Sequence, residues 1–263
     1  MKLKKAFQYE FLEGIRVMGW TALWAVVALI FVPIIVTALT GRMNTLSPED
    51  FLPNGFLGFA LMIFLLIFSA ATYDSFQFLI QNGVGRKTYF YSKTLTIISI
   101  SIIGNIARLL YNWGALPFNK TRNGFEISSF DALYQHYFSG AFFNNMMLFI
   151  LLVVFTICIA ATLMFSGSIL SLFDRRVQII LIIGIPIMLI LALLIILRVD
   201  TGWGWQLTWI GKAIYWIVGV PAEYTPADIG HWNLWHPLIS GVIYSLVLFG
   251  GTYFFNLKLK TPR

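Results

Sequence analysis

The chain has 263 residues, of which 59% are hydrophobic and only 11% are charged. This small number of polar side chains cannot cover the surface of a water-soluble globule, and the composition therefore excludes a soluble protein. It predicts a single transmembrane domain that comprises residues 1–263. The net charge of +7 is compatible with nucleic-acid binding, but the basic residues lie in short clusters beside apolar runs, which is typical of topology signals. We therefore expect the lipid bilayer as a partner and no nucleic acid.

The N-terminal stretch, residues 1–16, has the pattern of an amphipathic helix. Leu3, Phe7, Phe11 and Ile15 recur every four residues, whereas most charged and amide side chains lie elsewhere on the helical wheel. This spacing predicts a helix that lies on the inner leaflet with its apolar stripe against the lipid. A simple basic flank that fixes the topology is the alternative interpretation.

Six later stretches are long and apolar enough to cross a bilayer, since a span needs roughly 20 such residues. They predict an all-α polytopic membrane protein with both termini inside, because that orientation places 12 of the 18 Lys and Arg residues on the inner side. The third stretch is the least regular, since Arg108 interrupts it. The predicted spans are residues 17–39, 51–71, 93–113, 141–165, 177–197 and 237–255.

The inner loop after the second span, residues 73–92, is longer than a connection requires. Asn82-Gly83 is a typical C-terminal stop for a helix, and Gly85 permits a turn before the next helix, so the loop predicts a short helix near the membrane surface. Apolar side chains in an aqueous loop indicate that another protein docks there. Alternatively, they dip into the lipid headgroups. These apolar side chains include Phe76, Phe78 and Val84.

The outer segment before the last span, residues 200–235, is rich in tryptophan. An apolar helical face runs along residues 209–217, but Lys212 interrupts it and Pro221 ends it. The face is too short to cross the bilayer and predicts an outer interfacial or re-entrant helix, which serves either as an anchoring belt or as a gate for a substrate. The residues assigned to this outer interface or gate are Trp205, Trp209, Ile214 and Trp216.

The chain lacks the residue sets that would make it an enzyme. Residues 83–88 differ from a phosphate-binding loop, because Arg86 separates Gly85 from the lysine and a membrane helix comes before them. His231 and His236 are five residues apart with no acidic or cysteine partner adjacent, so no metal site is predicted. The spans hold no acid that would couple transport to an ion. We therefore expect no cofactor in this chain and an energy source in a partner.

The run of residues 76–90, with its aromatic, amide and Asn-Gly-Val-x-Arg-Lys pattern, resembles a loop of bacterial ABC-type exporter permeases of the type 2 family. The layout of spans and surface segments also fits that family. The resemblance implies a permease subunit in a bacterial cell membrane that moves a hydrophobic or amphipathic substrate, such as a peptide, an antibiotic or a lipid-like molecule. It implies two cytoplasmic ATPase subunits, which hold ATP and Mg, and a second permease that is identical or related.

In such exporters the inner loop forms a coupling helix on the ATPase. The resemblance therefore assigns ATPase coupling to Phe76, Phe78, Ile80, Val84, Arg86 and Lys87. By position alone, Asp174, Arg175 and Arg176 between spans four and five form a second contact. The alternative function is a non-transporting immunity or assembly factor that acts through the tryptophan-rich outer segment. A membrane-embedded enzyme is a weaker third hypothesis, since no catalytic set can be assembled.

Overall fold

The computed structural model describes residues 2–41, 56–70, 73–115, 131–134, 137–199, 208–221 and 230–259, and these ranges contain helices and no strand. A π-helical stretch, η1, covers Val27–Phe31. The α-helices are α1 (Lys2–Val26), α2 (Val32–Leu39), α4 (Phe56–Ala70), α5 (Tyr73–Gln81), α6 (Arg86–Ala115), α7 (Asp131–Tyr134), α8 (Ala141–Leu170), α9 (Arg175–Val199), α10 (Thr208–Val218) and α11 (Trp235–Lys258).

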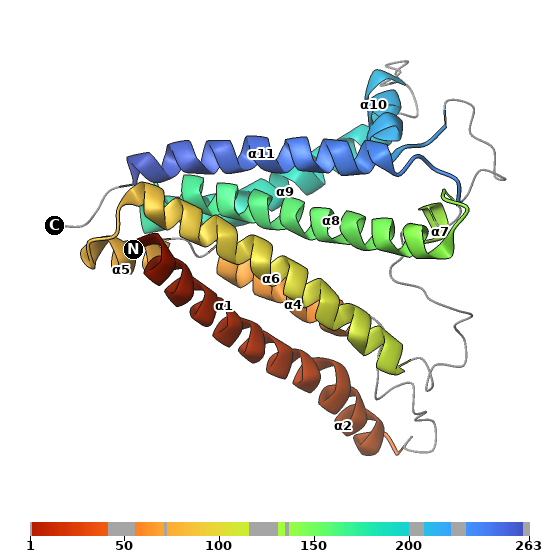
Figure 1. Cartoon of the computed structure of the whole chain (residues 1–263), viewed down its shortest axis with the longest axis horizontal. Coiled ribbons are helices and arrows are strands. Elements are labelled where there is room, and N and C mark those ends of the chain that lie inside the picture. The colour runs from red at the N-terminus through yellow and green to blue at the C-terminus, as the bar shows by residue number, and fades with distance from the viewer. Residues whose placement is uncertain are drawn as a thin grey trace.

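The long helices form an elongated bundle (Figure 1). Helices α8 and α11 lie side by side and share the most extensive contact, while α1 packs on α6 and α4, and α4 packs on α8. The two ends of the chain lie at the same end of the bundle, next to α5 and the α8–α9 turn, and α7 and α10 lie at the opposite end (Figure 1). The bundle therefore has two chemically distinct ends, which we call the α5 end and the α10 end.

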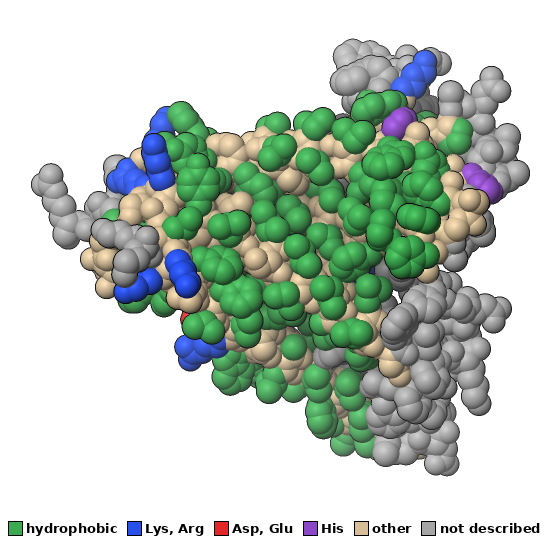
Figure 2. Space-filling view, viewed as in Figure 1, with side chains coloured by type: hydrophobic (Ala, Val, Ile, Leu, Met, Phe, Trp, Pro, Cys, Tyr) green, Lys and Arg blue, Asp and Glu red, His purple; other side chains and the backbone are tan. Residues whose placement is uncertain are grey.

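The core of the bundle is apolar and is contributed by α4, α6, α8 and α11. Apolar side chains also cover much of its outer surface (Figure 2), and Ile180, Leu246 and Val247 are exposed by 67%, 66% and 67%. Continuous apolar surface of this kind is stable against lipid rather than water. The buried core residues are Leu61, Phe64, Leu65, Phe68, Phe90, Ile97, Ile100, Ala160, Ala161, Met164 and Phe249.

Three helices of the described ranges are long and apolar enough to cross a membrane: residues 86–111 of α6, residues 142–170 of α8, and α11. The pair α4 and α5, inclined at 47°, passes the same test when taken together. These findings support a multi-helix membrane protein. Each predicted span overlaps a helix, but the count of six spans and their orientation stay predictions, and residues 51–55 and 71 of the second span lie outside the described residues.

The N-terminal region differs from its prediction. Instead of a separate surface helix that ends at Arg16, α1 runs unbroken to Val26 and continues through η1 and α2 to Leu39. Within the predicted apolar stripe, Leu3 and Ile15 are 41% and 45% exposed, whereas Phe11 packs partly against the core, and the contact of the stripe with lipid stays a prediction. The face of α1 that packs on α6 and α4 consists mostly of small side chains, which allow a close approach. The buried positions of α1 are Ala6, Glu10, Gly14, Thr21 and Ala25.

The π-helical stretch lies just before Pro33, which the sequence places inside the first predicted span. A proline has no N–H to give to the carbonyl one turn earlier, so the regular hydrogen-bond ladder is interrupted there. The ladder is shifted by one residue instead, and the N–H of Val32 donates to the carbonyl of Val27. Local widening of this kind lets the helix continue through a proline.

Candidate functional site

The short helix α5 is present where the sequence predicts one, and it ends at the predicted stop. The N–H of Val84 donates to the carbonyl of Leu79 (3.0 Å), and the N–H of Gly83 donates to the carbonyl of Ile80 (2.9 Å). This pair of bonds is the Schellman arrangement, which needs a left-handed residue after the helix, and Gly83 supplies it with a φ of 74°. Helix α5 is therefore a separately terminated element between α4 and α6.

The inner face of α5 packs against the rest of the same chain. Phe76 is fully buried in an apolar cluster with Leu79, Tyr89 and Leu259. The Phe76 and Tyr89 rings meet edge to face, with centroids 5.3 Å apart. Phe76 is therefore not an exposed side chain of an aqueous loop, as the sequence interpretation assumed, but anchors α5 to α6 and to Leu259 at the end of α11. Its role in ATPase coupling stays a prediction.

The other assigned coupling residues differ in exposure. Phe78 is 46% exposed and stacks on Tyr9 of α1, with ring centroids 4.9 Å apart. Lys87 is exposed, whereas the Arg86 guanidinium donates a hydrogen bond to the backbone carbonyl of Leu257 in α11. Ile80 and Val84, half-buried, pack against the Phe76 cluster. The exposed coupling residues are therefore Phe78 on α5 and Lys87 in the first turn of α6.

The predicted second contact lies at the same end of the bundle. The turn between α8 and α9 lies at the same end of the bundle as α5 in Figure 1, and Asp174 and Arg176 beside it are exposed. Leu172 and Phe173 beside them are exposed by 39% and 44%. The side chain of Arg175 lies outside the described residues. The α5 end thus presents apolar and charged side chains from two separate connections.

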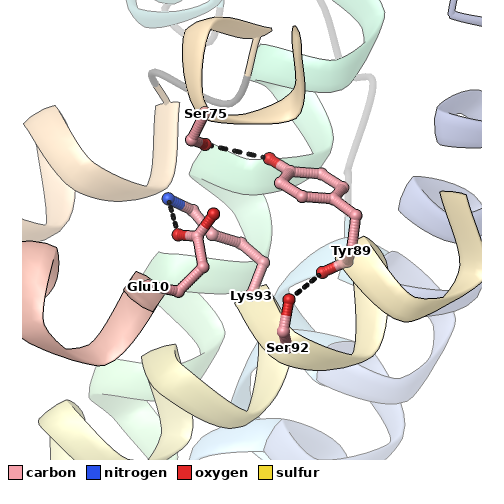
Figure 3. Close-up of polar contacts among 5 residues, drawn as sticks. All are labelled: Glu10, Ser75, Tyr89, Ser92 and Lys93. Atoms are coloured by element: carbon pink, nitrogen blue, oxygen red, sulfur yellow. Dashed lines mark hydrogen bonds and ion pairs between the residues drawn. The ribbon is translucent and has the colours of Figure 1, made fainter. Parts of the chain in front are cut away.

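A buried ion pair lies directly beneath α5 (Figure 3). Glu10 of α1 accepts a hydrogen bond from the Lys93 ammonium of α6 at 3.0 Å, and the two side chains are 0% and 1% exposed. The Lys93 nitrogen also lies 3.4 Å from the ring centre of Phe68 in α4. The second carboxylate oxygen of Glu10 has no hydrogen-bond partner among the described residues. One charged pair thereby joins α1, α4 and α6.

Tyr89 connects this pair to α5. Its hydroxyl lies 3.3 Å from the Ser75 hydroxyl on α5, and its carbonyl accepts a hydrogen bond from the Ser92 hydroxyl at 2.8 Å (Figure 3). Tyr89, Ser92 and Lys93 therefore belong to one turn region of α6 that contacts both α5 and α1. Within this region Tyr89 contacts α5, whereas Lys93 contacts α1.

Sequence reasoning missed the charged pair. The N-terminal helix was interpreted from its apolar stripe through Leu3 and Ile15, and Glu10 does not belong to that stripe. A usable signal was present, because Glu10 lies four residues after Ala6 and four before Gly14, on a face of small side chains. A carboxylate on such a face needs a cation from a neighbouring helix.

At the opposite end, α10 is the predicted interfacial helix, and its apolar side chains are largely exposed. Ile214 and Trp216 are 52% and 56% exposed. The Trp216 ring stacks on His236 with centroids 4.9 Å apart, and a hydrogen bond of 2.9 Å joins His236 Nδ1 to the Trp216 carbonyl. Trp205 and the side chain of Trp209 lie outside the described residues, so the anchor and gate roles stay predictions.

At the α10 end, hydrogen bonds join α10 to α7 and to the segment before α11. The Tyr134 hydroxyl of α7 donates to the carbonyl of Val218 at the end of α10, at 2.5 Å. Burial raises the pKa of Tyr134 to about 12. Gly219, with a φ of 82°, accepts a hydrogen bond from the N–H of Asn233 at 2.9 Å, and a side chain at position 219 would collide with the Asn233 backbone. These contacts bind α7 and the start of α11 to α10.

Comparison with protein-family models, with curated proteins and with solved structures finds no match for this chain. The family resemblance of the loop around α5 therefore stays a prediction.

Proposed function

We propose that this chain is the transmembrane permease subunit of an ATP-driven exporter of the ABC type 2 class, with ATP and Mg held by separate cytoplasmic subunits. The observation that carries the proposal is α5, a helix with its own terminating motif that lies at one end of the bundle (Figure 1). Its inner face is anchored through Phe76, while Phe78 on α5 and Lys87 in the first turn of α6 are exposed. This division is what a docking helix requires.

In this proposal the α5 end faces the cytoplasm of a bacterial cell. Lys and Arg side chains gather at this end in Figure 2, as the positive-inside rule requires. The described cations at this end include Lys4, Lys5, Arg16, Arg86, Lys87, Arg176 and Lys258.

A movement of α5 caused by a docked ATPase would be transmitted to the long helices α6 and α11 through specific contacts. The Phe76 and Tyr89 rings join α5 to α6, and the Arg86 bond to the Leu257 carbonyl joins the α5–α6 turn to α11. ATP binding in the partner would shift α5 and, with it, the start of α6 and the end of α11. Such shifts of packed helices are one way in which a bundle changes between two states. A second permease, identical or related, would complete the pathway for a hydrophobic or amphipathic substrate.

The test is co-purification of a cytoplasmic ATPase with the full chain from its native membrane in mild detergent. Lys87→Glu and Phe78→Asp alter exposed side chains, so both variants should insert and fold yet lose the ATPase. Lys212→Glu is the matched control, because it makes the same charge change on an exposed lysine of α10 at the opposite end. Phe76→Ala is a poor probe, since it removes a fully buried anchor.

A wild-type chain that never brings down an ATPase would overturn the exporter proposal. That result would favour the second candidate, a non-transporting immunity or assembly factor. The observation in favour of this candidate is the exposed face of α10, where Tyr215, Trp216 and Ile217 are 60%, 56% and 45% exposed. It predicts that Trp216→Ala abolishes function while Lys87→Glu does not.

A further inference from the structure

A pocket of about 690 Å³ opens on the side of the bundle between α8, α10 and α11, near the α10 end. Val154 and Phe155 of α8 form one wall, Ile243 and Val247 of α11 form another, and Ile217 of α10 closes the end. It is unrelated to the coupling residues at the α5 end. A volume of this size lies within the range of small-molecule sites.

The polar side chains in the wall already have partners within the chain. The Tyr134 hydroxyl donates to a carbonyl of α10 at 2.5 Å, and the Ser240 hydroxyl donates to the carbonyl one turn earlier at 2.7 Å. The Cys158 thiol bonds a carbonyl of α11 at 3.2 Å, and a hydrogen bond of 2.9 Å joins the Tyr244 hydroxyl to Thr162. The wall therefore offers its occupant apolar contact rather than hydrogen bonds.

The mouth of the pocket faces the surroundings of the bundle. Phe155, Ile243 and Val247 are exposed by 45%, 56% and 67%, and they lie on α8 and α11, two of the helices that can cross a membrane. On α11 the pocket extends from Pro237 to Val247, which is about 15 Å at 1.5 Å per residue. This length is half of a hydrocarbon core of about 30 Å, or the depth of one leaflet.

The chemistry, position and length of the pocket indicate its occupant. Its wall offers apolar contact, its mouth lies among exposed apolar side chains of α8 and α11, and its extent along α11 matches one leaflet. An unbranched hydrocarbon chain of the surrounding lipid meets all three conditions.

We propose that this pocket binds the hydrocarbon tail of a membrane lipid, which enters sideways from the leaflet at the α10 end. The aromatic pair Trp216 and His236 lies at that end, where the tail would meet its headgroup, a depth that tryptophan prefers. The tail lies along Ile243 and Val247 toward the middle of the bilayer. This assignment is independent of any ATPase.

The test is photolabelling of the full-length chain in lipid nanodiscs that contain a phosphatidylcholine with a diazirine in its acyl chain. Labelled peptides are quantified by mass spectrometry, with the exposed residues Ile180 and Met188 of α9 as an internal reference for general lipid contact. We expect the α11 peptide around Ile243 and Val247 to be labelled several-fold more than the reference. Equal labelling of the two peptides in the wild-type chain would overturn the proposal.

Three variants locate the label within α11. Ser240→Phe places a ring in the pocket and should reduce the α11 label to the level of the α9 reference, while Ser240→Ala should keep it. Val242→Phe adds a comparable ring at a 47% exposed site outside the pocket and should also keep it. An unchanged label in Ser240→Phe would show that the lipid contact lies elsewhere. The α9 label in the same sample reports whether each variant is inserted.

The outcome is separable from that of the co-purification experiment, since no ATPase and no ATP are present. Enriched labelling without a co-purifying ATPase would retain the lipid site and remove the exporter. A co-purifying ATPase without enriched labelling would do the reverse.

Discussion

The buried pair of Glu10 and Lys93 makes the sharpest energetic prediction. With its two charged atoms 3.0 Å apart, the pair attraction is about 5–6 kcal/mol at an effective dielectric constant of about 20. Glu10→Leu removes that attraction and leaves the Lys93 ammonium, 1% exposed, without its anion. We expect the free energy of unfolding to fall by about 3–5 kcal/mol, the usual cost of breaking a buried pair from one side.

The measurement is reversible unfolding of the purified chain in mixed micelles by increasing fractions of a denaturing detergent. The double variant Glu10→Leu with Lys93→Met removes both charges and should recover most of the loss, because two apolar side chains need no partner. Lys4→Met is the control for Lys93→Met, because it makes the same substitution at an exposed site of α1, and it should have little effect on the free energy of unfolding. The reasoning is refuted if Glu10→Leu costs less than about 1 kcal/mol, or if the double variant is no more stable than the single one.

The remaining predictions concern backbone close contacts and one tyrosine. Gly83→Ala should lower the free energy of unfolding by about 1 kcal/mol, because a backbone φ of 74° is unfavourable for alanine. Gly85→Ala is the control, since its new methyl group would meet only Thr88, and it should lower the free energy of unfolding much less. In Gly167→Ala the new methyl group would collide with the backbone carbonyl of Ala70, so the variant should destabilise the contact between α4 and α8 by about 1–3 kcal/mol. Gly184→Ala is the control, since position 184 has open space around it, and it should leave the free energy of unfolding unchanged. Folding raises the pKa of Tyr134 to about 12, so the unfolded chain releases this proton first, from pH about 10 upward. The wild-type chain should therefore lose stability between pH about 10 and about 12 that Tyr134→Phe does not lose, as measured by detergent unfolding across that range.

Features that depend on neighbouring residues were predictable from the sequence. Helix α5 and its end follow from Asn82-Gly83, because the left-handed turn after a helix is a local property of glycine. The all-helical, apolar character of the described residues follows from the long hydrophobic runs. These signals act over a few residues and need no knowledge of tertiary contacts.

Features that depend on residues distant in the sequence were not predictable from the sequence. The burial of Phe76 depends on Leu259, which is remote in sequence, so an apolar side chain in a polar loop looked like a docking residue. The packed face of α1 includes Glu10, whose partner Lys93 lies on α6, so the pattern of the isolated helix does not reveal this contact. The lateral pocket likewise exists only where α8, α10 and α11 come together.

The ion pair between α1 and α6 also constrains how the chain is made. Glu10 lies on α1, which is synthesised before α6, and its cation is 83 residues further along the chain. Until that stretch is synthesised, α1 carries a carboxylate that lipid alone solvates poorly. The final position of α1 in the membrane therefore requires the arrival of α6.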